Sequence, residues 1–400
     1  MRLTVVNQFY APDISPTAQL ATSLAEHRAE RGDHVTIVTG RAGYLEDLTP
    51  TGVVRTGPEL RIRRVWTPGL GKSSRGRRLL GYLAFFLGAA PRLVVMRRQD
   101  VIVAMTTPPF VLLTAVLHRL LHPRTRVVLW SMDCYPDAAE RFGELATGGW
   151  AANVLRRFNR WLFRRVDVVV GLDGAMVELL RTQYATSATR PAFEVIPNWE
   201  RIEQFPGEAA VPSELYRSID VAGRAVVLYL GNTGVGHAFG TVLDAAADLA
   251  DDALFLFVGG GARWADLEDE VAASGLRNVV LRGYVPKEDT PGVMAGAHLA
   301  LITLDDRSLG VMSPSKLHAN LAAGLPVVYV GPEGSNVDEA IQRYGVGRSV
   351  RHGDVKAFIG AVRELLGDEA ARQRARRAFE EHYSDVAVLP AFDRVIESAG

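Results

Sequence analysis

The sequence predicts an α/β protein with two domains, each built around a parallel β-sheet. Its 400 residues exceed the roughly 150 residues of an average domain. Short apolar runs alternate with helical stretches along the whole chain, as is typical of βαβ units. The alternation starts afresh after a polar stretch that ends at Pro212. We therefore expect two facing Rossmann-like domains, with ligands bound in the cleft at the carboxyl ends of the strands.

The expected elements can be placed in order by their hydrophobic patterns. In the first half we expect a helix over 17–31 and strands over 3–6, 34–39, 101–104, 126–130 and 166–171. In the second half we expect helices over 241–249 and 316–323, and strands over 226–230, 254–258, 279–281, 299–303 and 326–330. The break between the halves falls near Pro197, which predicts domains over 1–200 and 207–384.

Composition excludes several classes of protein. Forty-five Lys and Arg residues balance forty-five Asp and Glu residues, which argues against a general nucleic-acid binder. The single cysteine, Cys134, excludes an intramolecular disulfide and a cysteine-built metal site. The first residues do not form a signal peptide, and the apolar run 79–90 is too short for a bilayer about 30 Å thick. We expect a cytoplasmic protein, or one peripheral on the inner face of the membrane.

One long segment departs from the overall charge balance. Between Arg61 and Arg98 there are ten basic residues and no acidic one, and the apolar sequence 80–87 lies among them. A second basic cluster, 156–165, has aromatic residues between its arginines. Basic residues beside exposed apolar side chains favour docking on an anionic membrane surface. The alternative is two ordinary helices with apolar faces in the core and arginines in water.

Glycine-bearing turns follow two predicted strands of the second domain. The first contains Gly231, Asn232, Gly234 and Gly236, and the second spans 259–261. Small residues let the backbone approach a phosphate, and a following helix offers free N–H groups. Such turns are also common where no ligand binds, so both interpretations stay open.

The segment from Ser313 to Leu317 predicts the start of a helix. Ser313 suits the N-cap and Pro314 the first helical position, which leaves the N–H groups of Ser315 and Lys316 facing solvent or a ligand. The Lys316 ammonium adds a positive charge there and is a candidate diphosphate clamp. The alternative is a well-capped surface helix with a solvated lysine.

Acidic residues follow strands in both domains. Glu339 follows the strand 326–330 and could bind a hydroxyl of a sugar or ribose, as could Asn336 and Asp338. The two acids could equally stabilise the first turn of a helix. Asp133 follows the strand 126–130 and could orient an acceptor hydroxyl, act as a base or cap a turn.

Taken in order, these motifs resemble those of the family 4 glycosyltransferases, which are retaining sugar transferases of GT-B fold. The resemblance points to the bacterial branch that builds cell-surface polysaccharide. The matching segments are 7–12, 32–40, 107–109, 133–137, 195–199, 231–234, 258–261, 314–317 and 321–328. The last of these, Leu-Ala-Ala-Gly-Leu-Pro-Val-Val, is the most specific.

The resemblance implies transfer of a sugar from a nucleoside diphosphate donor, with UDP favoured, to an acceptor hydroxyl, with retention and without a metal or another cofactor. The domain 207–384 would hold the donor. The domain 1–200, completed by a helix over 385–400, would hold the acceptor, which is a glycan, a lipid-linked intermediate or a small molecule. We assign Asp133, Lys316 and His237 to catalysis. The residues assigned to donor binding are Gly231, Asn232, Gly234, Gly236, Gly283, Tyr284, Val285, Ser313, Ser315 and Glu339.

The chain departs from the family pattern around the donor helix. Many relatives have two glutamates there, and the second of them binds the ribose hydroxyls. This chain has Val311 and Ala319 at the two positions. The Arg and Lys that often follow the first turn of the donor domain are replaced in a region containing Val235 and His237. These losses keep open the alternative of a catalytically silent GT-B protein that binds a glycan or a partner transferase. An epimerase or a phosphorylase of the same architecture is a further alternative.

Overall fold

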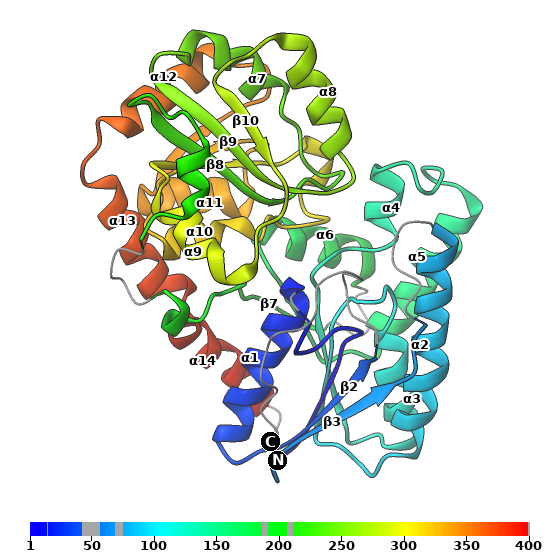
Figure 1. Cartoon of the computed structure of the whole chain (residues 1–400). Coiled ribbons are helices and arrows are strands. Elements are labelled where there is room, and N and C mark those ends of the chain that lie inside the picture. The colour runs from blue at the N-terminus through cyan, green and yellow to red at the C-terminus, as the bar shows by residue number, and fades with distance from the viewer. Residues whose placement is uncertain (14, 42–56, 69–74, 186–190, 206–210, 399–400) are drawn as a thin grey trace. The chain divides into compact units, whose positions relative to one another are not determined.

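The structure, a computed structural model, describes residues 1–13, 15–41, 57–68, 75–185, 191–205 and 211–398 (Figure 1). It divides into two compact units. The first unit is Met1–Pro197 together with Leu389–Gly400, and the second is Asn198–Val388. Each unit contains its own parallel sheet, so the predicted α/β class with two parallel-sheet domains is confirmed.

The first unit is built on a seven-stranded sheet in the order β3-β2-β1-β4-β5-β6-β7. Its strands are β1 (Arg2–Val6), β2 (His34–Gly40), β3 (Leu60–Val65), β4 (Val101–Ala104), β5 (Arg126–Trp130), β6 (Val168–Gly171) and β7 (Ala192–Val195). Its helices are α1 (Pro16–Glu30), α2 (Arg75–Val95), α3 (Leu112–Leu121), α4 (Asp137–Arg141), α5 (Trp150–Phe163) and α6 (Gly174–Tyr184). The five predicted strands of this half are confirmed, and the two edge strands, β3 and β7, were not predicted.

The second unit has a six-stranded sheet in the order β10-β9-β8-β11-β12-β13. Its strands are β8 (Ala225–Asn232), β9 (Ala253–Gly260), β10 (Val279–Arg282), β11 (Leu299–Thr303), β12 (Val327–Val330) and β13 (Gly347–Val350). Its helices are α7 (Gly240–Ala246), α8 (Trp264–Ser274), α9 (Thr290–Ala295), α10 (Lys316–Ala322), α11 (Asn336–Tyr344), α12 (Val355–Leu366) and α13 (Ala371–Ala378). A π-helical turn, η6 (Phe379–Tyr383), leads into α14 (Asp385–Glu397). The short 3-10 turns are η1 (Ile202–Gln204), η2 (Glu214–Ser218), η3 (Ala247–Leu249), η4 (Lys287–Asp289) and η5 (Asp306–Ser308).

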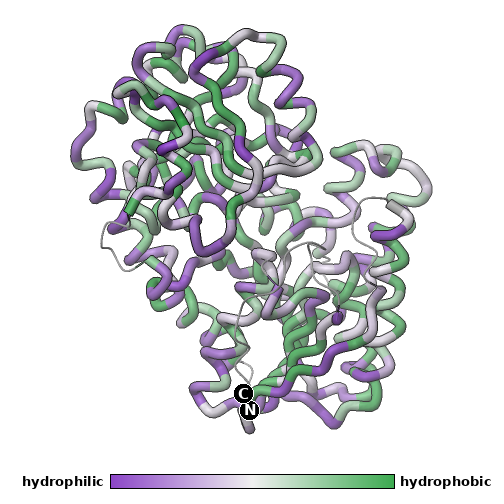
Figure 2. The backbone as a smooth tube through the Cα atoms, viewed as in Figure 1, coloured by the Kyte–Doolittle hydropathy of each residue, from purple (hydrophilic) through white to green (hydrophobic). Residues whose placement is uncertain are grey.

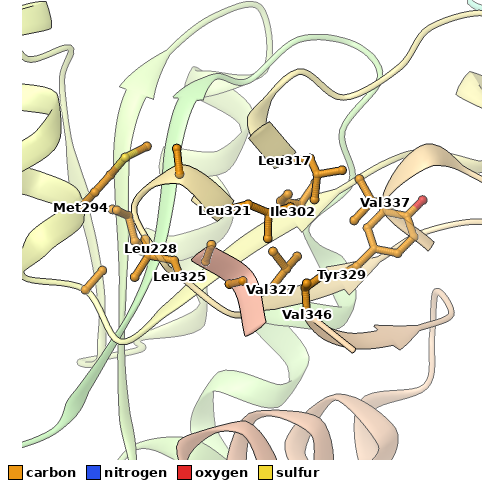
Figure 3. Close-up of a cluster of buried hydrophobic side chains, with 14 of the residues drawn as sticks. Leu228, Met294, Ile302, Leu317, Leu321, Leu325, Val327, Tyr329, Val337 and Val346 are labelled. Atoms are coloured by element: carbon orange, nitrogen blue, oxygen red, sulfur yellow. The ribbon is translucent and has the colours of Figure 1, made fainter. Parts of the chain in front are cut away.

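The sheet of the second unit is buried on both faces. All eight residues of β9 are buried. Leu254 and Leu256 belong to a hydrophobic cluster on one face, and Phe255 and Phe257 belong to a cluster on the other. Figure 3 shows the first of these clusters, in which two leucines of α10 pack against strand residues. The position of α10, and therefore of its first residue Lys316, is fixed by this packing.

Helix α2 is longer than its apolar sequence predicted. It continues through Pro91 and Arg92 to Val95, and the Arg92 side chain donates to the Gly88 carbonyl one turn earlier at 2.9 Å. By length and composition alone, the segment Gly76–Val95 could cross a membrane, so the expectation that this apolar run is too short is wrong. A single helix of this kind is weak support for a span.

A buried ionic network holds the last helix to the first unit. Arg28 of α1 is only 3% exposed and bonds to Asp33 and Asp393 at 2.7 Å each. The same guanidinium donates to Glu397 at 2.7 Å. Phe392 of α14 also packs on Trp130 of β5, with ring centres 4.5 Å apart. The residues of α14 from Leu389 onward are thereby attached to the first unit.

Replacing Arg28 with alanine is expected to lower the free energy of unfolding by about 3 kcal/mol, because it removes the partner that the buried carboxylates of Asp33 and Asp393 share. The matched control is Arg31→Ala. The Arg31 side chain is 49% exposed and lies 3.3 Å from Glu397, so its loss should cost less than about 1 kcal/mol. Urea denaturation followed by circular dichroism compares the two variants, and equal losses would contradict the expectation.

Candidate functional site

Lys316 is the first residue of α10, and its side chain reaches the carboxyl end of β8. Its Nζ donates to the backbone oxygen of Asn232 at 3.0 Å and lies 3.2 Å from Nε2 of His237. The same atom lies 4.8 Å from the centre of the Tyr229 ring, within range of a cation–π interaction. The ammonium is thus held by three groups of the β8 region, unlike the solvated lysine of the alternative interpretation.

The start of α10 differs from its prediction. The N-cap is Ser315 rather than Ser313, and Ser313 and Pro314 lie in the preceding loop. The Pro314 carbonyl in this loop accepts a hydrogen bond from Asn336 Nδ2 at 3.4 Å. The helix register is instead set by the buried side chains of α10. Lys316 therefore occupies the first helical position that was predicted for Pro314.

The glycines of the two predicted turns lie partly within strands. β8 runs through Asn232 and β9 through Gly260, so the first turn begins at Thr233. Gly231 has a φ of 121°, a conformation that favours glycine. A Cβ on Gly231 would lie 3.3 Å from Cε of Lys316, and one on Gly259 would lie 2.1 Å from the Gly231 oxygen. These glycines therefore allow the strand ends and the lysine side chain to approach closely.

His237 is held as a neutral imidazole. Its Nδ1 lies 2.7 Å from the carbonyl oxygen of Thr303, which can only accept, so Nδ1 carries the hydrogen. Its Nε2 is then left as an acceptor for the Lys316 ammonium. Burial, and next the Lys316 charge, lower the pKa of His237 to about 3. An imidazole with so low a pKa does not serve as a general acid near neutral pH.

Burial also changes the acidity of Lys316. The side chain is half-buried, and burial lowers the pKa of its ammonium from 10.5 to about 7. The three groups that hold it carry no full negative charge. The lysine is therefore a cation that gains from any anion bound beside it.

Tyr284 lies at the carboxyl end of the neighbouring strands. A Cβ on Gly260 would lie 2.8 Å from the Tyr284 ring, and the Tyr284 hydroxyl donates to Oδ1 of Asn232 at 3.3 Å. The Tyr284 side chain is 53% exposed. Asn232 thus contacts Tyr284 through its side chain and Lys316 through its backbone. Gly283 and Val285 flank Tyr284 at the end of β10, which pairs with β9.

The remaining predicted residues of the second unit have other environments. The loop at Gly234 and Gly236 packs against the segment before α10, where a Cβ on Gly236 would lie 2.7 Å from Met312 Sδ. Glu339 lies in the first turn of α11 with an exposed side chain. Its neighbour Asp338 is buried and paired with Arg351 at 2.9 Å, so Asp338 has a structural environment. Val311 is fully buried.

Asp133 lies in the first unit, after β5. Thr106, which follows β4, accepts through its hydroxyl from the backbone N–H groups of Met132 and Asp133 at 2.9 and 3.2 Å. Asp133 also lines a cavity of about 30 Å³, together with apolar residues and with polar residues that include Thr106, Ser131 and Asn159. The loops after β4 and β5 are thus joined, and Asp133 is at the carboxyl end of the sheet as predicted.

Several groups of this arrangement were not predicted. Thr303 fixes the tautomer of His237, and Tyr229 lies beneath the lysine. Neither residue belongs to one of the predicted motifs, because both lie within buried strands, Thr303 in β11 and Tyr229 in β8. Among the described residues, no group of three or more His, Cys, Asp or Glu side chains is arranged to hold a metal ion.

Two family models match the chain. Residues 17–199 match the glycosyl transferase 4-like domain, and residues 224–368 match the glycosyl transferases group 1 domain. Together the two matches cover most of the sequence. The chain belongs to the glycosyltransferases of GT-B fold, as its sequence motifs predicted.

Bacterial relatives are similar over much of the chain. WbjE of Pseudomonas aeruginosa, a probable glycosyltransferase, is 27% identical over 309 residues, which are 74% of either chain. WcaI of Escherichia coli, a putative colanic acid biosynthesis glycosyl transferase, is 25% identical over 399 residues, covering 95% of this chain and 97% of WcaI.

Solved structures share the fold of the whole chain. HepE of Anabaena, solved in complex with UDP, has a TM-score of 0.71 at 15% identity, with 100% of both chains covered. Sucrose-phosphate synthase from Thermosynechococcus elongatus has the same TM-score and identity, covering 100% of this chain and 99% of that one. These likenesses confirm the GT-B fold.

Lysine-selective ¹³C labelling should show a Lys316 Cε signal that titrates near pH 7, because burial lowers the pKa of this ammonium. The sequence has four lysines, so the spectrum is simple, and Lys316→Met identifies the signal. The unfolded chain keeps this proton up to about pH 10, so the free energy of unfolding should rise with pH between 7 and 10. Lys316→Met should remove this contribution. A Lys316 midpoint equal to that of free lysine would contradict the expectation.

Proposed function

We propose that the protein transfers a sugar from a nucleoside diphosphate donor, with UDP as the nucleotide, to an acceptor hydroxyl during polysaccharide biosynthesis, with retention and without a metal. The observation that carries the proposal is the Lys316 ammonium, held at the carboxyl end of the sheet by the Asn232 carbonyl and neutral His237. The similarity to WcaI and WbjE, which are described as glycosyltransferases, supports the transferase activity, and the UDP bound to HepE supports the donor.

In this proposal the unit Asn198–Val388 is the donor domain. The leaving diphosphate gathers negative charge in the transition state, and the Lys316 ammonium stabilises that charge where it develops. The base lies near the backbone of Gly283, Tyr284 and Val285, and the turn that contains Gly234 and Gly236 lies near the phosphates. Ser313, Ser315 and Glu339 are proposed as further donor contacts. The lysine supplies the positive charge, so no metal takes part.

The unit Met1–Pro197 with Leu389–Gly400 is the proposed acceptor domain. Asp133 lies at the carboxyl end of its sheet and lines the cavity of about 30 Å³. Its carboxylate orients the acceptor hydroxyl, and in a retaining reaction the leaving phosphate takes the hydroxyl proton. The acceptor is a glycan or a lipid-linked intermediate, in keeping with the putative role of WcaI in colanic acid biosynthesis.

A thermal-shift panel of UDP, GDP, ADP, CMP and dTDP tests the donor assignment. UDP at 100 times its dissociation constant should stabilise the fold by about 2.7 kcal/mol. Lys316→Ala should remove most of this shift and lower turnover by about 100-fold, because it deletes the charge opposite the diphosphate.

The matched control is Lys356→Ala, an exposed lysine of α12. This variant should respond to UDP as the native protein does. An equal UDP response in Lys316→Ala would sink the diphosphate assignment. No response to any nucleotide in the native protein would favour the silent binding protein, since Val311 and Ala319 offer the ribose no polar side chain.

We further propose that the protein docks on the inner membrane surface through α2. This helix is apolar on two faces. Phe85, Ala89 and Leu93 are buried against the first unit, and a second stripe that includes Leu83 and Leu87 is exposed. Figure 2, which colours the backbone by hydropathy, shows that hydrophobic residues make up much of this helix. The other exposed apolar residues of this stripe are Leu79, Leu80 and Val95. Exposure of an apolar stripe to water is unfavourable, and insertion of the stripe into a bilayer interface is favourable because it removes that exposure.

Arginines lie at both ends of this stripe, where they can meet lipid headgroups. Arg77 and Arg78 precede the leucines, and Arg97 and Arg98 follow them. Arg78 also pairs with Glu144 at 3.0 Å. Lys72, which belongs to the same basic run, lies outside the described residues. The second basic cluster fits the ordinary-helix alternative better, because its Leu162 and Phe163 are buried.

Leu83→Asp with Leu87→Asp should release the protein from vesicles of anionic phospholipid, because two charges would enter the stripe that contacts the bilayer. The matched control is Val211→Asp, whose side chain is exposed in the second unit. A sedimentation assay should show at least a tenfold drop in bound protein for the α2 variant and no drop for the control. Equal retention of both would rule out docking through α2.

A further inference from the structure

The Lys316 ammonium has three N–H donors and can accept no hydrogen bond. Within the described part of the chain, two acceptors lie within hydrogen-bond distance of Nζ. These are the Asn232 oxygen at 3.0 Å and His237 Nε2 at 3.2 Å. Among the described residues the third N–H has no oxygen or nitrogen acceptor at this distance, so it is available to a ligand. The two acceptors therefore determine the direction of the third N–H.

His237 is itself held firmly. Its Nδ1 donates to the Thr303 carbonyl at the end of β11, at 2.7 Å. Its ring stands edge-on to Tyr229, with centres 5.7 Å apart, and stacks on Phe239 at 6.4 Å. Turning the ring over would break the bond to Thr303 and place Cε1–H, which accepts no hydrogen bond, opposite the lysine. The packing and the Thr303 bond thus keep the Nε2 lone pair directed at Lys316.

We propose that His237 is a positioning residue, whose neutral Nε2 holds the Lys316 ammonium in place for the donor diphosphate. This proposal rests on the diphosphate role of Lys316 and replaces the catalytic role that the sequence suggested for His237. A neutral acceptor orients the ammonium without cancelling its charge. A carboxylate at the same place would hold the lysine at least as firmly, but it would neutralise the charge that the diphosphate needs.

Three substitutions separate orientation from charge. His237→Phe keeps an aromatic ring but removes the acceptor, and should weaken UDP binding about tenfold. His237→Gln offers a neutral acceptor and should bind UDP within about threefold of the native protein. His237→Glu offers a charged acceptor and should weaken binding by more than tenfold. Isothermal titration calorimetry with UDP at pH 7 measures all three.

A double-mutant cycle tests whether His237 acts through Lys316. If it does, His237→Phe should have no further effect on UDP binding in a Lys316→Ala background. Additive losses would show that His237 acts separately and would overturn the proposal. The proposal would also be overturned if His237→Phe bound UDP with native affinity while Lys316→Ala bound it weakly. That result would leave the diphosphate role of Lys316 intact. Native UDP affinity in Lys316→Ala would instead overturn the diphosphate role of Lys316. Absence of UDP binding by the native protein would overturn the choice of UDP. Either result removes the basis of the proposal for His237.

Circular dichroism and the melting temperature without nucleotide check the fold of each variant. If His237→Phe does not fold, the comparison of His237→Gln with His237→Glu decides the question. Equal UDP affinity in these two variants would overturn the proposal, because the charge at position 237 would then not matter to the diphosphate.

Discussion

Burial of each parallel sheet on both faces is the constraint on which the rest of this structure depends. Every residue of β9 is buried, and neighbouring side chains enter opposite hydrophobic clusters. Polar groups have no place along such strands, so they gather where the strands end. Asn232, His237, Tyr284 and Lys316 meet at one such edge. The location of the candidate site thus follows from the way the core is built.

The same constraint explains which parts of the fold could be predicted. Strands buried on both faces are continuous apolar runs, as in 254–258, and these were found. Edge strands lack this signal. β3 carries arginines at three of its six positions, and most of β7 is exposed. The motifs identified Lys316, Asn232 and His237, but the sequence did not indicate that these residues contact one another. The role of Thr303 in fixing the His237 tautomer could not be predicted, because the hydrogen bond goes to its backbone carbonyl. The prediction that Ser313 is the N-cap was wrong, because burial of the α10 leucines determines where the helix begins.

Helix α2 shows how a sequence pattern can be correct and still incomplete. The apolar run and its arginines are plain in the sequence, but periodicity alone does not say which side faces the core. In the structure, Phe85 and Leu93 are fully buried, and Leu87 on another face is 69% exposed. Gly88 lies close to the sheet, since a Cβ there would lie 2.8 Å from Val65 Cβ. The exposed leucines are therefore not needed for packing against the first unit.

Lys316 differs from a solvated surface lysine in how strongly its protonation would be coupled to the binding of an anion. Burial lowers the pKa of Lys316 to about 7, which means that the surroundings of the lysine disfavour its charged form. A bound diphosphate favours that form, so binding and protonation support each other. Neutral His237 matters for this coupling, because a carboxylate in its place would satisfy the charge before any ligand arrived. A half-buried lysine with a neutral partner thus keeps its electrostatic attraction for an anion.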